Sequence, residues 1–527
     1  MSLVKHTSTI GGLTLLSRLF GFVRDMLLAR VLGAGLAADA YQLAFRLPNT
    51  FRRLFAEGAF SVAFVPMFSR KLHEEGGGEA AAERFSADVL SVFLWVLLVF
   101  TTLAMIGMSG IVWLLARDYA QVPGKFELAV LLSRITFPYL ALISLVSLLT
   151  GILNSKSRFG PGAFAPVLFN LTLISGIVIG YYLRGPGGSD KIVVLVLSGA
   201  VALSGLVQLI YLGWAVRRTG FTMRIGRPRL TPDVRKLGRV ILPATFGAGI
   251  YQISQFVDTF FATQLPQGSL TLLAMGDRLN QMPLGIVGIA LGTAILPMLS
   301  RHIASGDEAA ASRILSQAIE LAMLLTIPAA VALAICAPAF VNAFFVGGKY
   351  TIADGAVTAH IVRALVAGLP AYVLVKILTP GFFARNDTRT PVLTAAAALI
   401  VNIALILVII GPFGIVGLAA AGACAAWLNT LLLAIILVRK GQFLPTLALA
   451  GRLARQLVAA AIMAGMLWWL TRYFETWFIG SIGQRAVALA SLVIAGAAGY
   501  FVSAYLLGAL DRDRINQLLR RKPLPPA

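Results

Sequence analysis

Long apolar runs, each about the length needed to cross a lipid bilayer, constrain the fold of this chain more than any other feature. A transmembrane helix needs about 20 mostly apolar residues to cross a hydrocarbon core about 30 Å thick. About fourteen segments of the sequence meet this requirement. Because the runs are continuous and do not alternate with polar residues, they predict membrane helices rather than a β-barrel. We therefore expect an all-α polytopic membrane protein with spans at 10–32, 36–68, 87–116, 127–153, 159–183, 191–216, 236–263, 269–298, 310–336, 353–384, 389–411, 414–438, 451–474 and 483–508.

The charge of the chain indicates how those helices are oriented. The 527 residues include 44 Lys and Arg but only 22 Asp and Glu, which gives a formal net charge of +22 although 58% of the residues are hydrophobic. About 27 of the cations fall on one side of the predicted helices and about 7 on the other. Since cytoplasmic loops of membrane proteins are enriched in Lys and Arg, we expect both termini in the cytoplasm. Nucleic-acid binding is a weaker explanation, because no fold for it is recognisable.

A repeat with an offset of about 231 residues relates two parts of the sequence. The run VAFVPMFSR at 62–70 returns as TAILPMLSR at 293–301, and Asn170 returns as Asn402. Corresponding segments are six helices apart, which is an even number. The two halves are therefore expected to have the same orientation and to be related by a parallel pseudo-two-fold axis.

This repeat divides the predicted helices into lobes. We expect an N-terminal six-helix lobe over 1–218 and a C-terminal six-helix lobe over 219–443. Two extra transmembrane helices and a basic cytoplasmic tail follow over 444–527. Parallel repeats of this kind are typical of transporters, with the substrate site between the lobes.

About ten cations fall inside the predicted helices, where each costs roughly 2.5–3.5 kcal/mol at a helix centre. Six of them lie in the first two segments, and too few acidic residues accompany them to balance the charge. Because a guanidinium stays charged and binds phosphate through two nitrogens, the excess indicates a water-filled cavity for an anionic, phosphorylated substrate. The cations are Arg18, Arg24, Arg30, Arg46, Arg52, Arg53, Arg134, Arg278, Arg363 and Lys376.

Not all of these cations are expected in the cavity. The strongest candidates are Arg18, Arg24, Arg52 and Arg278. The alternative for the others is a structural position: Arg30, Arg46 and Arg53 at helix ends, paired with Asp39 or Glu57, and Arg134, Arg363 and Lys376 near the membrane interfaces.

The sequence lacks the motifs of common enzyme classes. It contains no GxxxxGK[ST] phosphate-binding loop, no GxSxG and no HExxH. Its two cysteines, Cys336 and Cys424, lie in apolar runs without disulfide or metal-ligand spacing. We therefore expect neither an enzyme nor a metal site.

Longer motifs point to a family. The run SRLFGFVRD at 17–25 is followed by ADAY at 38–41 and RLPNTFRRLFAEGA at 46–59, and GDRL at 276–279 precedes PLG at 283–285. These motifs resemble the MurJ (MviN) family of the multidrug/oligosaccharidyl-lipid/polysaccharide exporter superfamily. The resemblance covers essentially the whole chain, including the two extra helices.

The resemblance implies a flippase of the bacterial cytoplasmic (inner) membrane. Such a protein carries lipid II, the undecaprenyl-pyrophosphate-linked muropeptide of peptidoglycan biosynthesis, from the inner to the outer leaflet by alternating access through a central cavity. It also implies a groove for the polyprenyl tail along the last two helices, 451–474 and 483–508. No cofactor is implied, and coupling to the membrane potential or to a monovalent cation stays open, with Asp258 and Asn402 too few for a sodium cage.

Family positions transfer to this chain one residue at a time. The implied substrate-binding residues are Arg18, Arg24, Arg52, Arg278, Asp39, Ser17, Asn49 and Glu57. A structural or gating role is assigned to Asp25, Arg53, Asp277 and Gln281. Some members carry an acid where this chain has Gln281, so a carboxylate role is not expected there.

Other functions stay open at this point. A flippase for another polyprenyl-linked glycan and a drug exporter of the same superfamily share the predicted fold, but a drug exporter is expected to line its cavity with carboxylates. A non-transporting membrane scaffold for cell-wall synthesis is a further alternative, and other cell-wall synthesis proteins are expected partners besides lipid II and the bilayer.

Overall fold

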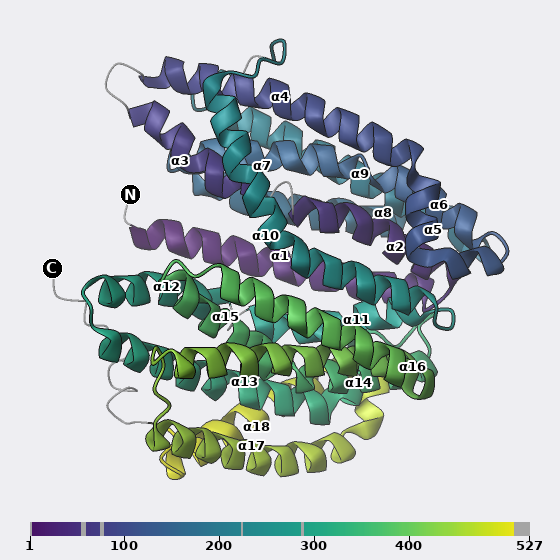
Figure 1. Ribbon diagram of the computed structural model, residues 1–527. Coiled ribbons are helices and arrows are strands. Elements are labelled where there is room, and N and C mark those ends of the chain that lie inside the picture. Colours follow the sequence, from purple (N-terminus) through teal and green to yellow (C-terminus); the bar gives the residue numbers. More distant parts are fainter. Residues whose placement is uncertain (1–2, 54–58, 74–77, 223–224, 286–288, 511–527) are drawn as a thin grey trace. The chain divides into compact units, whose positions relative to one another are not determined.

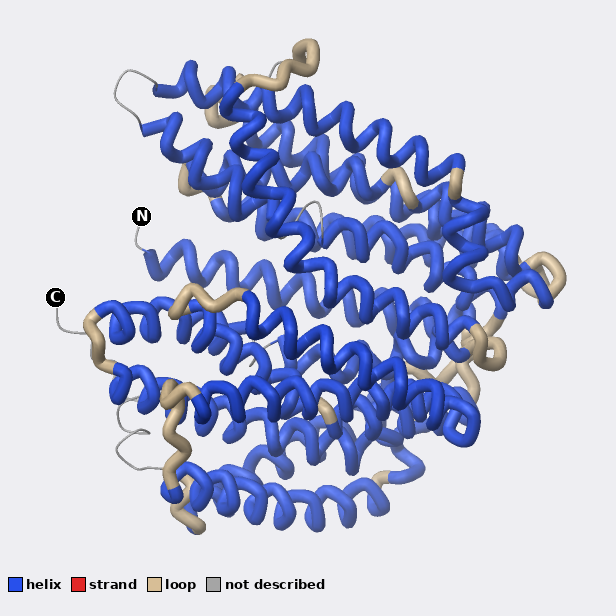
Figure 2. The backbone as a smooth tube through the Cα atoms, in the orientation of Figure 1, coloured by secondary structure: helices blue, strands red, loops and turns tan. Residues whose placement is uncertain are grey.

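The computed structural model describes residues 3–53, 59–73, 78–222, 225–285 and 289–510, and nearly all of them lie in helices joined by short loops (Figure 1) (Figure 2). Two short 3₁₀ helices are η2 (Arg117–Gln121) and η4 (Glu475–Ile479). The α-helices are α1 (Leu3–Leu32), α2 (Leu36–Arg52), α3 (Ala59–His73), α4 (Gly78–Ile106), α5 (Met108–Ala116), α6 (Lys125–Thr136), α7 (Tyr139–Ser155), α8 (Phe159–Arg184), α9 (Asp190–Arg217), α10 (Pro232–Thr263), α11 (Ser269–Pro283), α12 (Ile289–Ala304), α13 (Glu308–Phe344), α14 (Ile352–Ala367), α15 (Leu369–Phe383), α16 (Arg389–Arg439), α17 (Leu447–Tyr473) and α18 (Ile482–Leu506).

These helices follow the fourteen predicted spans. Within the described residues, nine helices are long and apolar enough to cross a membrane by length and composition. The longest, α16, covers two predicted spans, and Gly414 interrupts its helical backbone with φ 53° and ψ −133°. The all-α, multi-pass membrane fold predicted from the apolar runs is therefore confirmed.

Helix breaks recur at equivalent places in the two halves. Between α6 and α7, the fourth span is interrupted next to Pro138. Between α14 and α15, the tenth span is interrupted at Gly368, with Pro370 following. A proline removes a backbone donor and restricts the preceding residue, so each break has a cause in the sequence.

Side-chain contacts repeat in the same way. Lys156 forms an ion pair with Glu79, and Arg385 forms one with Glu308. In both pairs the partners are 77 residues apart. The internal repeat found in the sequence therefore appears as matching contacts inside each half.

The described contacts group the chain into two compact units. The first unit is Met1–Thr271 together with Gly348–Tyr350, and the second is Leu272–Gly347 with Thr351–Ala527. In the first, α8 packs against α1 and α9; in the second, α13 packs against α14, α15, α17 and α18. The lobe boundary at 218/219 follows the repeat and stays a prediction.

Candidate substrate-binding site

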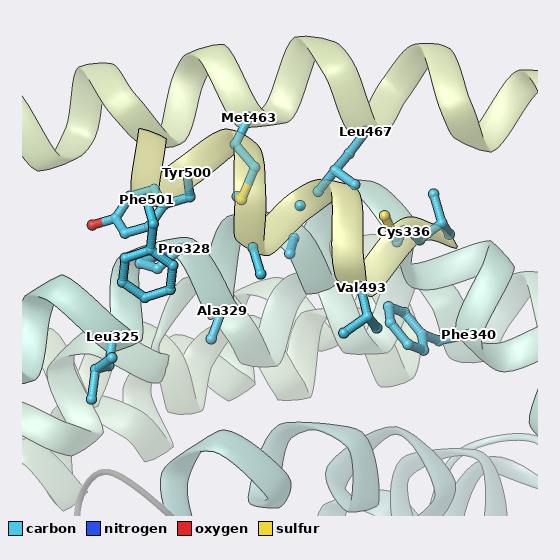
Figure 3. A pocket seen from close by; sticks show the side chains of 14 residues that line it. Leu325, Pro328, Ala329, Cys336, Phe340, Met463, Leu467, Val493, Tyr500 and Phe501 are labelled. Carbon is cyan, nitrogen blue, oxygen red and sulfur yellow. The ribbon is translucent and has the colours of Figure 1, made fainter. Parts of the chain in front are cut away.

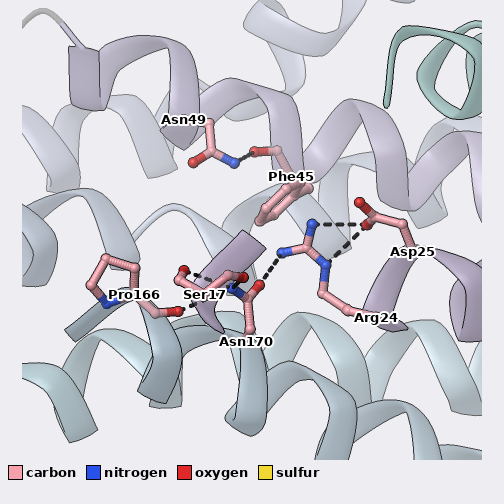
Figure 4. Close-up of polar contacts among 7 residues, drawn as sticks. All are labelled: Ser17, Arg24, Asp25, Phe45, Asn49, Pro166 and Asn170. Carbon is pink, nitrogen blue, oxygen red and sulfur yellow. Dashed lines mark hydrogen bonds and ion pairs between the residues drawn. The ribbon is translucent and has the colours of Figure 1, made fainter. Parts of the chain in front are cut away.

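Arg24, on α1, lies at the centre of a buried polar network. The residue is only 8% exposed. Its Nε and Nη2 atoms donate to Oδ1 of Asp25 at 3.0 and 2.8 Å, and its Nη1 atom donates to Oδ1 of Asn170 at 3.0 Å (Figure 4). The guanidinium carbon also lies 5.9 and 5.7 Å from the ring centroids of Phe45 and Phe169. The first unit thus holds a desolvated arginine by charge-assisted bonds, which are stronger than neutral ones.

The amide of Asn170 links this arginine to an earlier turn of α1. Its Nδ2 atom donates to the carbonyl of Ser17 at 2.9 Å and lies 3.3 Å from the Ser17 hydroxyl, and it also donates to the carbonyl of Pro166 at 3.1 Å. Figure 4 shows the Asn170 side chain between Ser17 and Arg24. Asn170 was not predicted as a site residue. Its correspondence to Asn402 in the internal repeat is the one sequence feature that could have indicated it.

The two arginines of α1 have different surroundings. A separation of six residues places Arg18 and Arg24 about 9 Å apart along the axis and about 120° apart in azimuth. Arg24 is buried against α8, whereas Arg18 is exposed. The helix therefore presents one accessible guanidinium and one that is already engaged by protein groups.

The predicted residues of α2 are less tightly held. The Asn49 amide donates to the carbonyl of Phe45 on its own helix at 3.0 Å, so it does not join the Arg24 network through that bond. Arg52 is half-buried and Arg53 is exposed. Glu57, which the sequence also placed at the site, lies outside the described residues.

Asp39, at the start of α2, is buried and fully engaged. The residue is 2% exposed, and Lys125 donates to its Oδ2 atom at 3.1 Å. The backbone N–H of Gly268 donates to Oδ2 at 2.7 Å, while the backbone and hydroxyl of Thr271 donate to Oδ1 at 3.1 and 2.8 Å. Lys125 also lies 4.0 Å from the ring centroid of Tyr119. All these residues belong to the first unit, and the carboxylate binds the first turn of α11 there.

The candidate residues of the second unit lie on α11. Arg278 and Asp277 are both half-buried, and Gln281 is exposed. The Gln281 amide donates to the Asp277 carboxylate one turn earlier. A neutral side chain at position 281 therefore serves as a hydrogen-bond donor to an acid, which a second carboxylate could not do when ionised.

An apolar cavity of about 250 Å³ lies within the second unit, between α13, α17 and α18. Figure 3 shows side chains from these three helices around it. They include Pro328 and Phe340 from α13, Met463 from α17, and Val493 and Phe501 from α18. A space of this composition suits a hydrocarbon chain.

The structure thus brings together some of the predicted residues. Asn170 links Ser17 to Arg24 in the first unit, and Arg24 in turn donates directly to Asp25. Asp39 belongs to a different buried network in the same unit. The substrate-binding roles of the predicted residues stay predictions.

Comparison with known proteins identifies relatives over the full length of the chain. The family model described as "Lipid II flippase MurJ" matches residues 28–488. A "Probable lipid II flippase MurJ" of Rhizobium meliloti (strain 1021) is 41% identical and covers 99% of this chain and 97% of its own. The "Lipid II flippase MurJ" of Burkholderia cenocepacia is 34% identical, with 96% and 98% covered.

Solved structures show the same fold. A lipid II flippase MurJ in an inward closed conformation aligns with a TM-score of 0.75 at 22% identity, over 97% of this chain and 99% of that one. An inward-facing multidrug transporter of the MATE family aligns with a TM-score of 0.66 at 15% identity, over 81% and 96%.

Proposed function

Because the chain belongs to the lipid II flippase MurJ family, we propose that it carries lipid II from the inner to the outer leaflet of the bacterial cytoplasmic membrane by alternating access. Full-length identity of 41% to a relative named as a probable lipid II flippase supports this substrate. The fold of a multi-pass membrane transporter, with internally repeated contacts, supports the mechanism.

The observation that carries the proposal is the pair of arginines on α1. Lipid II bears a pyrophosphate, and a guanidinium binds phosphate oxygens through two nitrogens, so two arginines on one helix offer successive contacts for this anion. In this proposal the exposed Arg18 makes the first contact with the substrate. Arg24 then exchanges part of its bonding to Asp25 for a phosphate oxygen, which keeps its charge paired throughout.

The apolar cavity beside the last two helices supports a place for the tail. Its lining comes from α13, α17 and α18, and the polyprenyl chain of lipid II is an apolar ligand of the kind such walls accept. In the proposed mechanism the headgroup crosses along polar groups while part of the tail stays among apolar side chains.

The role of Asp39 is revised within the proposal. Its two oxygens already accept hydrogen bonds from Lys125, Gly268 and Thr271. We assign it to holding the start of α11 on α2 in this conformation, rather than to contact with the substrate. Its carboxylate also complements the partial positive charge at the start of α11.

Orientation, coupling and partners form part of the same proposal. The distribution of Lys and Arg supports cytoplasmic termini in the inner membrane. Arginines that cross part of the membrane with the moving lobes would couple transport to the membrane potential without a bound ion or cofactor. Besides lipid II and the bilayer, cell-wall synthesis proteins that make or consume lipid II are the proposed partners.

Cells depleted of their own flippase test the function. We expect the wild-type chain to restore lipid II on the outer face of the membrane, and Arg24→Ala to fail at equal expression, whereas Arg472→Gln, an exposed arginine of α17 stacked on Trp468, serves as the matched control. Exposure of a different polyprenyl-linked glycan without lipid II would overturn the substrate. Full activity of Arg24→Ala would overturn the arginine mechanism.

A further inference from the structure

Two arginines that the proposed transport site does not use occupy equivalent places in the two halves. Arg134 lies on α6 and Arg363 on α14, and both side chains are exposed. The Nε atom of Arg134 donates to the carbonyl of Met105 at 3.2 Å, and that of Arg363 donates to the carbonyl of Ala334 at 3.1 Å. Donor and acceptor are 29 residues apart in both cases. The repeat therefore preserves an arginine and its hydrogen bond from Nε to a backbone carbonyl at the equivalent position in each half.

One carbonyl lies at a helix end and the other lies one turn before a proline. The carbonyl of Ala334 would normally accept from residue 338, but Pro338 has no backbone N–H. Met105 lies at the end of α4, which is separated from α5 by Gly107. Each arginine donates through its Nε atom to the neighbouring helix, and the Nη2 atom of Arg134 also lies 3.5 Å from the Ser109 hydroxyl on α5.

The position of these arginines along their spans places them inside the membrane. The span Lys125–Ser155 has 31 residues and Ile352–Phe383 has 32, so each is about 45–48 Å long and exceeds a hydrocarbon core of about 30 Å. If each span is centred, the Cα atoms of Arg134 and Arg363 lie about 5–9 Å inside the nearer edge of that core. An arginine side chain is long enough to reach the headgroup region from this depth.

The surface around these side chains is mostly apolar. On the same face of α6, Leu131 is 46% exposed, and Ile106 at the end of α4 is 72% exposed. On the face of α14 that carries Arg363, the exposed neighbours are Ala356, His360 and Ala367. Within the described part of the chain, the bonds of Arg134 go to Met105 and weakly to Ser109, with no carboxylate partner. An exposed cation in such surroundings is costly unless an anion from the membrane pairs with it.

We propose that Arg134 and Arg363 each bind the phosphate of a membrane phospholipid, which gives each half of the protein one lipid headgroup site. Phospholipid phosphates are the abundant anions just outside the hydrocarbon core, and the guanidinium fork binds phosphate through two nitrogens. The Nε bond to the bent helix fixes the orientation of the fork. This inference does not depend on the identity of the transported substrate.

Native mass spectrometry tests the proposal. The full-length protein is reconstituted in phosphate-free buffer into nanodiscs of phosphatidylethanolamine and phosphatidylglycerol, and the phospholipids retained after release are counted. We expect Arg134→Gln and Arg363→Gln each to lose about one lipid per protein, and the double variant to lose both. Arg472→Gln, which changes another exposed arginine, is expected to lose none. An excess of inorganic phosphate is not expected to displace the lipids, because it lacks the acyl chains.

The outcomes separate a lipid site from a purely structural role. If the arginines only complete the bent helices, the glutamine variants melt at a lower temperature but retain as many lipids as the wild type, and the proposal is overturned. If the glutamine variants do not fold, Arg134→Lys and Arg363→Lys replace them. Lysine keeps the charge but has neither the Nε bond nor the two-nitrogen fork, so fewer retained lipids than in the wild type support binding by the fork, and full retention of lipid at lower thermal stability overturns it.

Discussion

Replacing Asp39 by asparagine probes the buried network at the start of α2. Two donors converge on each oxygen of this carboxylate: Lys125 and Gly268 on Oδ2, and the backbone and hydroxyl of Thr271 on Oδ1. In either orientation of the asparagine amide, its NH₂ group faces two donors, so two hydrogen bonds are lost. The ammonium of Lys125, which is 3% exposed, also loses its anion.

The size of the effect follows from that geometry. Breaking a buried ion pair by removing one partner costs about 3–5 kcal/mol, because a charge is left unpaired. Replacing both partners by neutral groups is often close to neutral. We therefore expect Asp39→Asn to destabilise the protein by about 3–5 kcal/mol, and Lys125→Met to remove a large part of that loss when it is added to Asp39→Asn.

A double-mutant cycle measures this coupling. The free energy of unfolding is determined in detergent micelles for the wild type, both single variants and the double variant. The reasoning predicts that the double variant is more stable than the sum of the single effects by about 1–3 kcal/mol. Additive effects, or a loss below about 1 kcal/mol for Asp39→Asn, would refute it.

Three further predictions concern separate features. Asn170→Leu is expected to reduce lipid II transport about tenfold or more, because the bond to the buried arginine of α1 is worth about 1.5–3 kcal/mol, and transport assays at equal expression check this. A hydrogen bond from Lys440 lowers the pKa of Asp387 to about 2, so stability from this carboxylate is present above about pH 4 and lost as the pH falls towards 2. As the pH falls over that range, the melting temperature of Asp387→Asn is expected to decrease less than that of the wild type. Gly348→Ala is expected to lower the melting temperature more than Gly306→Ala: both have positive φ, but only at 348 would a Cβ collide with a backbone carbonyl of α1.

The fold could be predicted because its main determinant is local. Continuous apolar runs of sufficient length dictate membrane helices, and the prolines near the breaks of the fourth and tenth spans mark interruptions in the sequence itself. Even the orientation of the repeat follows from counting helices. None of this requires knowledge of which helices touch.

The candidate site was only partly predictable, because partners are chosen by tertiary packing. Arg24 and Asn170 are 146 residues apart, and Lys125 and Asp39 are 86 apart. A charge in a membrane segment indicates that a partner exists, but its position in the sequence does not identify that partner. The family resemblance implies a substrate-binding role for Asp39, and only the structure shows that Lys125, Gly268 and Thr271 donate to its buried carboxylate.

Arg134 shows a second limit of the sequence. A charge near a membrane interface is expected to be a snorkelling side chain, and the sequence supports nothing more specific. The bond to a carbonyl at a helix bend, repeated at Arg363, is visible only in three dimensions.

Transport of lipid II by the purified protein in vesicles tests the central claim most directly. Lipid II is placed in one leaflet, and its appearance in the other is followed with a probe that does not cross the membrane. The account predicts rapid transfer by the wild type and by Arg472→Gln. For folded Arg18→Gln and Arg24→Gln it predicts a rate that is reduced at least about tenfold. Transfer at the wild-type rate by the double variant Arg18→Gln/Arg24→Gln, or no transfer by the wild type, would contradict it.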